Sequence, residues 1–217
     1  MVRVLENHIR SSCLWNNSIL EALESKAINE DTFLDNAVKP IINGVFSDLP
    51  HVTIHWTRDR IRCGDFCSSE ELLFPNCHIS VKNQSILVLE AKPSRATAQD
   101  YRDDRVKLMD ELRLTTDGLL RRGMDEFVVG ILVTGYKVEM FVMSLIYEAC
   151  YVPVEFGTFT LVEGRFQIGG LLGAAAPLLA ARAIVSKILA DMRGVPGKPI
   201  KESLVRGTYH TKPLKIA

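Results

Sequence analysis

The sequence predicts an α/β fold in which helices flank one central mixed β-sheet, and three observations support it. Residues 85–92, SILVLEAK, are apolar on both faces of an extended chain until the last few positions, as in a buried strand. Residues 30–46 repeat apolar side chains at helical spacing. The order along the chain is helix, three strands, helix, then further strands and a helix, which is typical of an α/β protein.

Each element follows from its own pattern. In residues 30–46 the apolar stripe contains Pro40, which should kink or split the helix. Strict alternation predicts a strand at 51–57, and residues 97–123 form an amphipathic helix, or two, ended by Gly123. The remaining elements are a hairpin of strands 77–82 and 85–92 turning at Asn83–Gln84, strands 127–135, 136–146 and 151–162, and a helix at 175–192.

Composition suits one large domain with extensions. The chain has 217 residues, 47% of them hydrophobic, and a formal net charge of zero, which argues against a wholly basic surface gripping nucleic acid. We expect an N-terminal helical extension at 1–28 with a short helix at 17–25, a domain at 29–192, and a loosely ordered tail at 193–217. That tail holds six Lys or Arg against one Glu.

Compartment follows from cysteine use and hydropathy. An odd number of cysteines, five, indicates a reducing compartment, so we expect an intracellular protein of the nucleus or cytoplasm. The N-terminus has no long apolar segment of a secretory signal. The most apolar window, 166–184, has only 16 residues between Arg165 and Arg182, short for a span of about 20. We read it as buried core and expect no membrane association.

The charged end of the apolar strand raises a question. Glu90 and Lys92 lie on the same face of the strand 85–92, two residues apart. Burying either charge unpaired costs several kcal/mol, on the order of the stability of a whole domain. Either something compensates for these charges, or they are a solvated strand end, because Pro93 follows directly.

Six motifs in order resemble the PD-(D/E)xK nuclease superfamily, in particular fungal nuclease-like proteins. They are NEDTFLDNAVKPIINGVF, VTIHWT, GDF, LEAKP, DRVKLMDEL and VTGYKVEMFVMSL, over residues 29–160 and by extension to 192. The resemblance implies a restriction-endonuclease-like core. Two departures concern Asp65: Cys63–Gly64 stand before it where this family usually has Arg-Pro, and 25 positions separate it from Glu90.

The resemblance implies a metal-dependent catalytic site. Asp65, Glu90 and the carbonyl of Ala91 would hold Mg²⁺ or Mn²⁺, and Lys92 would orient or activate the attacking water. Glu30 matches a further acidic residue of such sites. Alternatively, Asp65 is an ordinary turn residue after Gly64. Glu30 is alternatively an acidic residue at a helix N-terminus, where the helix dipole favours it.

Substrate contacts are expected from the following helix and its approach. Asp104 and Lys107 would form the outer wall of the site, unless they are an i,i+3 surface pair. Arg95, Arg102 and Arg105 would contact nucleic acid near the site, with affinity falling steeply as salt rises.

A rival metal site uses cysteine and histidine. Zinc could bind Cys63, Cys67, Cys77 and His78, with His51 or His55 as additional ligands. The spacing is not a usual zinc signature, and adjacent Cys77 and His78 rarely converge on one ion. The alternative is that these cysteines are packed thiols.

Two functions follow from these readings. The first is a metal-dependent nuclease that hydrolyses phosphodiester bonds of DNA or RNA. The second is a nuclease-fold module that no longer cuts and binds nucleic acid or a protein partner. The intact pair of Glu90 and Lys92 favours the first function, whereas the zero net charge and the missing Arg-Pro favour the second. Self-association is left open by the sequence.

Overall fold

The structure, a computed structural model, describes residues 29–57, 59–62, 73–93, 97–124, 127–147, 150–161 and 171–194. It contains a six-stranded mixed sheet with its strands in chain order, β1-β2-β3-β4-β5-β6. In this sheet β3 and β4 are parallel, and the other neighbouring pairs are antiparallel. The predicted α/β class with one mixed sheet flanked by helices is therefore confirmed. The expected extension at 1–28 lies outside the described residues. So does the tail predicted at 193–217, apart from Arg193 and Gly194, which are the last residues of α6.

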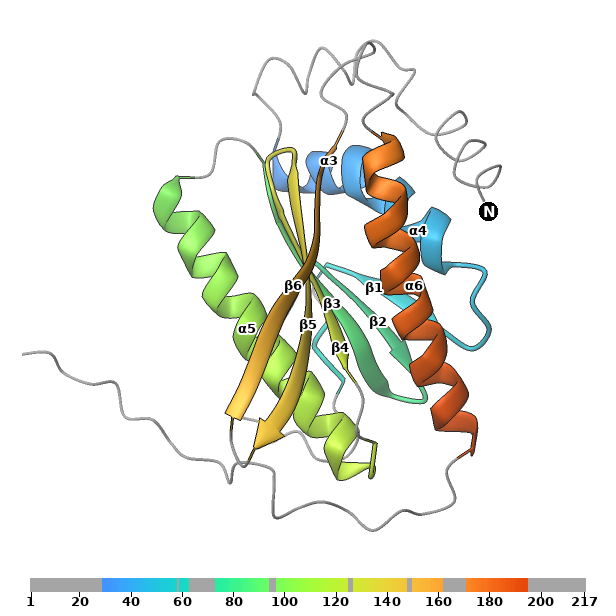
Figure 1. The fold of residues 1–217 in the computed structure, drawn as a ribbon. Coiled ribbons are helices and arrows are strands. Elements are labelled where there is room, and N and C mark those ends of the chain that lie inside the picture. The colour runs from blue at the N-terminus through green and yellow to red at the C-terminus, as the bar shows by residue number, and fades with distance from the viewer. Residues whose placement is uncertain are drawn as a thin grey trace, which may run out of the picture.

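Helices cover both faces of the sheet. α5 lies on one face, whereas α4 and α6 lie on the other (Figure 1). The strands are β1 (Thr53–Trp56), β2 (Cys77–Val81), β3 (Gln84–Lys92), β4 (Val128–Thr134), β5 (Lys137–Tyr147) and β6 (Cys150–Thr160). The helices are α3 (Glu30–Phe33), the π-helix η1 (Leu34–Val38), α4 (Lys39–Phe46), α5 (Ala98–Arg121) and α6 (Leu171–Gly194).

Pro40 splits the first helix, as its position predicts. Five residues before it adopt a π-helix, in which the Lys39 N–H bonds to the carbonyl of Leu34, five residues back. Proline has no N–H and its ring clashes with the carbonyl four residues earlier, so widening the preceding turn relieves the clash. Pro40 then lies in the first turn of α4, where its missing donor costs nothing.

The β2–β3 turn lies one residue earlier than predicted. Lys82 and Asn83 have φ angles of 45° and 60°, the positive values that a type I′ turn needs at both central positions. Gln84 is instead the first residue of β3, because its side chain is buried and donates to the backbone carbonyl of Thr115 on α5. A tertiary contact thus decided the turn position.

α6 is longer than predicted and is not broken by Pro177. It begins at Leu171 and packs on β6, where a Cβ on Gly157 would lie 2.6 Å from the Cβ of Pro177. Within the described residues, Gly173–Arg193 alone is long and apolar enough to cross a membrane, and 33% of that window is buried. A helix packed on a sheet has the same length and composition, so this criterion does not distinguish the two.

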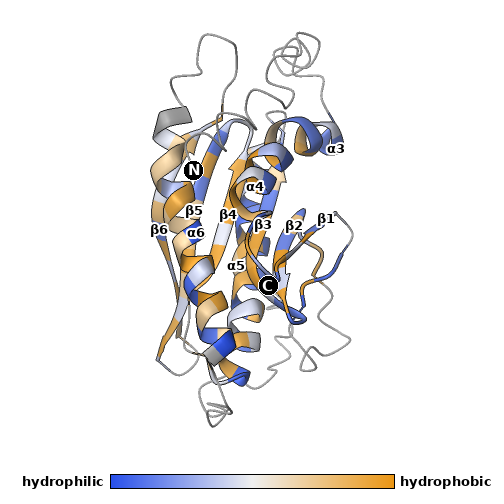
Figure 2. Cartoon of the chain, turned by 90° about the vertical axis from the view of Figure 1, so that its right-hand side faces the viewer, coloured by the Kyte–Doolittle hydropathy of each residue, from blue (hydrophilic) through white to orange (hydrophobic). Residues whose placement is uncertain are grey.

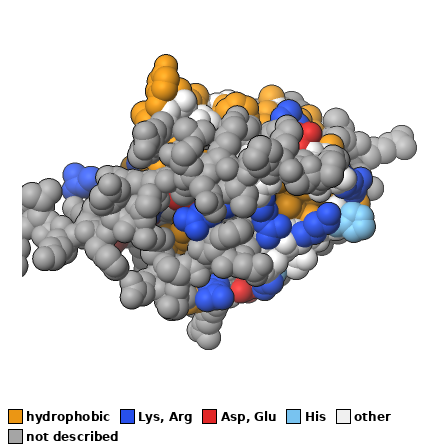
Figure 3. Space-filling view, turned by 90° about the horizontal axis from the view of Figure 1, so that it is seen from below, with side chains coloured by type: hydrophobic (Ala, Val, Ile, Leu, Met, Phe, Trp, Pro, Cys, Tyr) orange, Lys and Arg blue, Asp and Glu red, His pale blue; other side chains and the backbone are white. Residues whose placement is uncertain are grey.

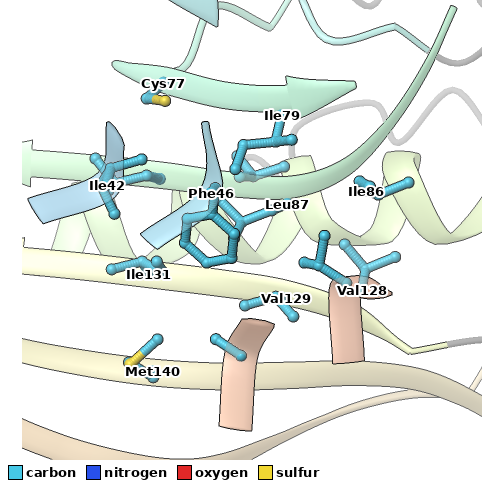
Figure 4. Packing of buried hydrophobic residues seen from close by; sticks show 14 of the residues in the cluster. Ile42, Phe46, Cys77, Ile79, Ile86, Leu87, Val128, Val129, Ile131 and Met140 are labelled. Carbon is cyan, nitrogen blue, oxygen red and sulfur yellow. The ribbon is translucent and has the colours of Figure 1, made fainter. Parts of the chain in front are cut away.

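The core fills both faces of the sheet, one against α5 and the other against α4 and α6. Figure 4 shows Ile42 and Phe46 of α4 over Leu87, Ile131 and Met140 of the sheet. Hydrophobic residues dominate β3 and β4 at the centre of the sheet (Figure 2). Residues facing each other across neighbouring strands share a face, so Cys77, Leu89, Ile131 and Met140 all belong to this core.

Gly130 sets the distance between α5 and the opposite face. A Cβ at this position would lie 2.5 Å from Cδ1 of Leu112. We expect Gly130→Ala to lower the free energy of unfolding by about 1–3 kcal/mol through overpacking, as measured by urea denaturation. The control is Gly173→Ala in α6, where nothing lies within 4 Å of the added Cβ. Equal stability of the two variants would contradict this packing.

Candidate functional site

The parallel strands β3 and β4 end at the upper end of the molecule in Figure 1. Charged side chains gather at this end of the strands. The start of α5 and the short helix α3 meet the sheet there. In open α/β sheets, ligands bind outside the carboxyl ends of parallel strands. This end of the sheet is therefore the candidate site.

The carboxylate of Glu30 joins three parts of the chain. Its Oε2 accepts a hydrogen bond from Lys92 Nζ at 2.7 Å, and its Oε1 accepts one from the Asn76 side-chain amide at 2.7 Å. The amide oxygen of Asn76 in turn accepts from the backbone N–H of Ala91 at 2.7 Å. Asn76 is buried, and it fixes the start of α3 against the end of β3.

Lys107 compensates the buried charge of Glu90. The side chain of Glu90 is 1% exposed, and its Oε1 lies 2.7 Å from Lys107 Nζ. Lys107 also donates to the backbone carbonyl of Phe74 and lies 3.8 Å from Glu111. The structure thus pairs Glu90 with Lys107 and Lys92 with Glu30. The alternative interpretation, that Glu90 is part of a solvated strand end, is therefore wrong. Lys107 balances the charge of Glu90 within the chain, so a metal is not the only compensating group.

Burial sets the protonation of this cluster. Burial, together with the neighbouring Glu90, raises the pKa of Glu111 to about 10, so Glu111 carries a proton at neutral pH. Burial also raises the pKa of Glu90, against the opposing charge of Lys107. Burial raises the pKa of Asp104 in the same way, and its Oδ2 has no hydrogen-bond partner among the described residues.

Lys92 shows the opposite balance. Its burial disfavours the ammonium, but the hydrogen bond and charge of Glu30 outweigh this and raise the pKa of Lys92. The ammonium therefore persists at neutral pH. Lys92 and Lys107 together offset the negative charge of the carboxylates around them, Glu30, Glu90 and Asp104, whereas Glu111 is protonated.

The buried proton of Glu111 predicts a pH dependence of stability. The unfolded chain releases this proton above the ordinary pKa of 4.5, whereas the native state keeps it until about 10. Its contribution is therefore fully present below pH 4.5 and is lost as pH rises toward 10. In chelator-containing buffer, we expect Glu111→Gln to gain stability relative to the parent with rising pH, by up to about 1.4 kcal/mol per pH unit. Parallel pH profiles from urea unfolding at pH 5–9 would contradict this assignment.

The predicted site residues divide into three groups: those that the structure brings together, those outside the described residues, and Arg105, which lies apart. The structure brings together Glu30, Glu90, Lys92, Asp104 and Lys107, with Ala91 held by Asn76 between them. Asp65 and Arg95 lie outside the described residues. Among the described residues, no three of these carboxyl groups bring one oxygen each within 4.8 Å of one another.

Arg105 belongs to a neighbouring group rather than to this cluster. It bonds to the Tyr101 hydroxyl, lies 3.6 Å from Glu139, and covers the ring of Phe141. Glu139 is two strands from Glu90 across Leu132, about 10 Å by sheet spacing. Burial opposes the ionised form of Glu139, but the hydrogen bonds from Tyr101 and Lys137 have the larger combined effect and lower the pKa of Glu139.

Sequence reasoning missed Asn76 and Glu111. Glu111 follows Lys107 by one helical turn and continues the face marked by Asp104, so the spacing could have found it. Asn76 directly follows Pro75 and precedes β2. The proline predicts the beginning of a strand, but it does not predict which residues Asn76 contacts. Its contacts depend on α3 and β3 and could not be read locally.

Cys77 and His78 cannot share one ion. They are neighbours on β2 and point to opposite faces: the Cys77 thiol lies in the core, where burial raises its pKa, and His78 lies on the other face. Cys63 and Cys67 lie outside the described residues. A different group of side chains that could hold a metal ion is formed by His55, Asp59 and His78.

Other surfaces offer less chemistry. A pocket between α4, α6 and the sheet is lined only by hydrophobic side chains, including Ile42, Leu89 and Leu178. At the end opposite the candidate site, Lys and Arg side chains are interspersed with hydrophobic ones (Figure 3). The candidate site thus remains the end of β3 and β4.

Comparison of the chain with protein-family models, with curated proteins and with solved structures finds no match.

Proposed function

We propose that this chain is a nuclease that hydrolyses phosphodiester bonds of DNA or RNA with the help of Mg²⁺ or Mn²⁺. The observation that carries the proposal is the convergence of Glu30, Glu90, Lys92 and Asp104 at the end of the parallel strands. Carboxylate and carbonyl oxygens are the ligands that Mg²⁺ prefers, and one or two carboxylates are enough. The donor set therefore fits the ion.

The arrangement also supports the resemblance to the PD-(D/E)xK superfamily and a restriction-endonuclease-like core. Pro75 and Asn76 directly precede the hairpin that carries Glu90 and Lys92, in the order Pro-Asp, hairpin, Glu-x-Lys. In this reading an amide replaces the first carboxylate of the motif. Asn76 is thus a second candidate for the position that sequence reasoning gave to Asp65.

In this proposal each residue has a distinct task. Glu90 and the carbonyl of Ala91, with Asp65, hold the metal ion, which lowers the pKa of a bound water and neutralises phosphate oxygens. Lys92 orients the attacking water and is itself held by Glu30. Lys107 favours the ionised form of Glu90 against the effect of burial. Asp104 and Lys107 border the phosphate, with Arg95 and Arg105 as outer contacts.

The activity is tested with the purified chain. We expect cleavage of single- or double-stranded DNA or RNA in millimolar Mg²⁺ or Mn²⁺ and none in excess chelator. All four substrates are needed, because the described residues of the site do not distinguish deoxyribose from ribose. Chelator-resistant cleavage, or no cleavage with either ion on any substrate, would reject the proposal.

A second candidate is a nuclease-fold module that does not cut and binds nucleic acid or a protein. Two observations favour it. Lys107 Nζ already forms an ion pair with Glu90 Oε1, at 2.7 Å, and residue 76 is Asn, an amide rather than a carboxylate. This reading predicts binding of nucleic acid without turnover, with affinity falling steeply as salt rises. Removing the tail after Met192 would then separate its contribution from that of the site. Under either reading we expect an intracellular protein.

A further inference from the structure

His55, Asp59 and His78 form a compact cluster at the β1–β2 edge of the sheet. His55 and His78 are direct partners across the two strands, with ring centroids 4.4 Å apart and an interplanar angle of 17°. His55 Nδ1 lies 2.6 Å from Asp59 Oδ2. The three residues offer ligand atoms that all lie within 4.8 Å of one another.

His78 is the unusual member of this cluster. Its side chain is buried, at 1% exposure, and neither ring nitrogen has a hydrogen-bond partner among the described residues. Burial lowers the pKa of His78 to about 4, so the ring is neutral at physiological pH and keeps a free lone pair. A buried imidazole with both nitrogens unsatisfied is costly, and a bound cation would satisfy one of them.

We propose that His55, Asp59 and His78 bind a zinc ion, at a site separate from the Glu90 cluster. Two imidazoles and one carboxylate are a common protein ligand set for zinc, and the fourth position is left for water or another ligand. Mg²⁺ favours all-oxygen ligands and would not select this site. The site is independent of the proposed nuclease activity, although Asn76 lies only two residues from His78 on β2.

The surroundings support a ligand role for His55. Its Nε2 lies 2.8 Å from the hydroxyl oxygen of Ser80. Metal-binding histidines commonly use their second nitrogen in such a hydrogen bond, which fixes the ring. With zinc on Nδ1, Nε2–H would donate to Ser80. The Ser80 hydroxyl can accept as well as donate, so the contact suits both the free and the bound state.

Arg62 is the competing group. Its guanidinium lies 3.2 Å from Asp59 Oδ2, and its side chain is 38% exposed. Zinc would displace this contact, and Arg62 can turn into solvent at little cost because exposed ion pairs contribute little. The ion would then cross-link β1, β2 and the segment at 59–62, and so stabilise the edge of the sheet.

Metal titration of the full chain tests the site. We expect one equivalent of Co²⁺ to give visible absorption bands of a four-coordinate nitrogen and oxygen site, and one equivalent of Zn²⁺ to abolish them. At free zinc about 100-fold above its Kd, Tm should rise by roughly 5–10 °C. Asp59→Asn and His78→Ala should each remove the bands and the Tm shift, and Ser80→Ala should weaken binding about 10–100-fold.

Matched variants separate this site from others. His51→Asn removes an exposed histidine with φ 65°, a backbone conformation that Asn tolerates, and should leave binding unchanged. Cys63→Ser with Cys67→Ser should also leave it unchanged. If His78→Ala does not fold, Asp59→Asn decides alone, because its side chain is 36% exposed. Binding that survives Asp59→Asn, requires the cysteines, or is absent from the parent would overturn the proposal.

Discussion

Lys92→Ala is expected to lower the rate of metal-dependent cleavage by about 10²–10⁴-fold, the range for losing a group that positions or deprotonates the attacking water. Lys92 is partly exposed and bonds to Glu30, whose other oxygen is held by Asn76. Removing the ammonium should therefore cost only about 1 kcal/mol of stability. Single-turnover cleavage and urea unfolding measure the two effects separately.

Two further variants define this result. Lys187→Ala also removes an ion pair, which Lys187 forms with Asp191 at 3.3 Å. Because Lys187 lies on α6, on the other side of the sheet, this variant should cleave at the parental rate. Glu90→Gln should lose both metal binding and cleavage, because a neutral amide is a poor Mg²⁺ ligand. Lys92→Ala should still bind metal and nucleic acid. Equal cleavage by Lys92→Ala and the parent would remove Lys92 from the reaction.

Lys107→Met is expected to give the largest loss of stability, about 3 kcal/mol at pH 8, near the low end of the cost of breaking a buried ion pair. Glu90 is 1% exposed and would keep its charge without a partner, or take up a proton. Because protonation is easier in acid, the loss should shrink at pH 5. Urea unfolding in chelator at both pH values measures the difference.

A second substitution, and the addition of Mg²⁺, test the cause of this loss of stability. Adding Glu90→Gln to Lys107→Met removes both charges and should recover most of the stability, since replacing both partners of a buried pair is nearly neutral. Millimolar Mg²⁺ should also rescue the single variant in part if Glu90 binds the ion. A loss of equal size at pH 5 and 8, unaffected by Glu90→Gln, would mean that Lys107 acts only through its packing.

The sequence alone predicted most of the described helices and strands and the α/β class of the fold. Hydrophobic periodicity depends on chain neighbours, so the strand carrying Glu90, the interruption at Pro40 and the long helix after Thr97 could be recognised locally. The sequence also marked Glu90 and Lys92 as charges needing compensation. It misplaced the hairpin turn by one residue, because Gln84 is held by Thr115 on α5.

The tertiary structure decided which charge meets which partner. Lys92 pairs with Glu30, 62 positions away, and Glu90 with Lys107, although Glu90 and Lys92 are near neighbours on one face. Such pairs depend on where α3 and α5 approach the strands, which no local pattern encodes. The same holds for His55 and His78, which face each other only through the register of β1 on β2. Elements follow from local periodicity, whereas the sites follow from the distances that packing imposes between remote segments.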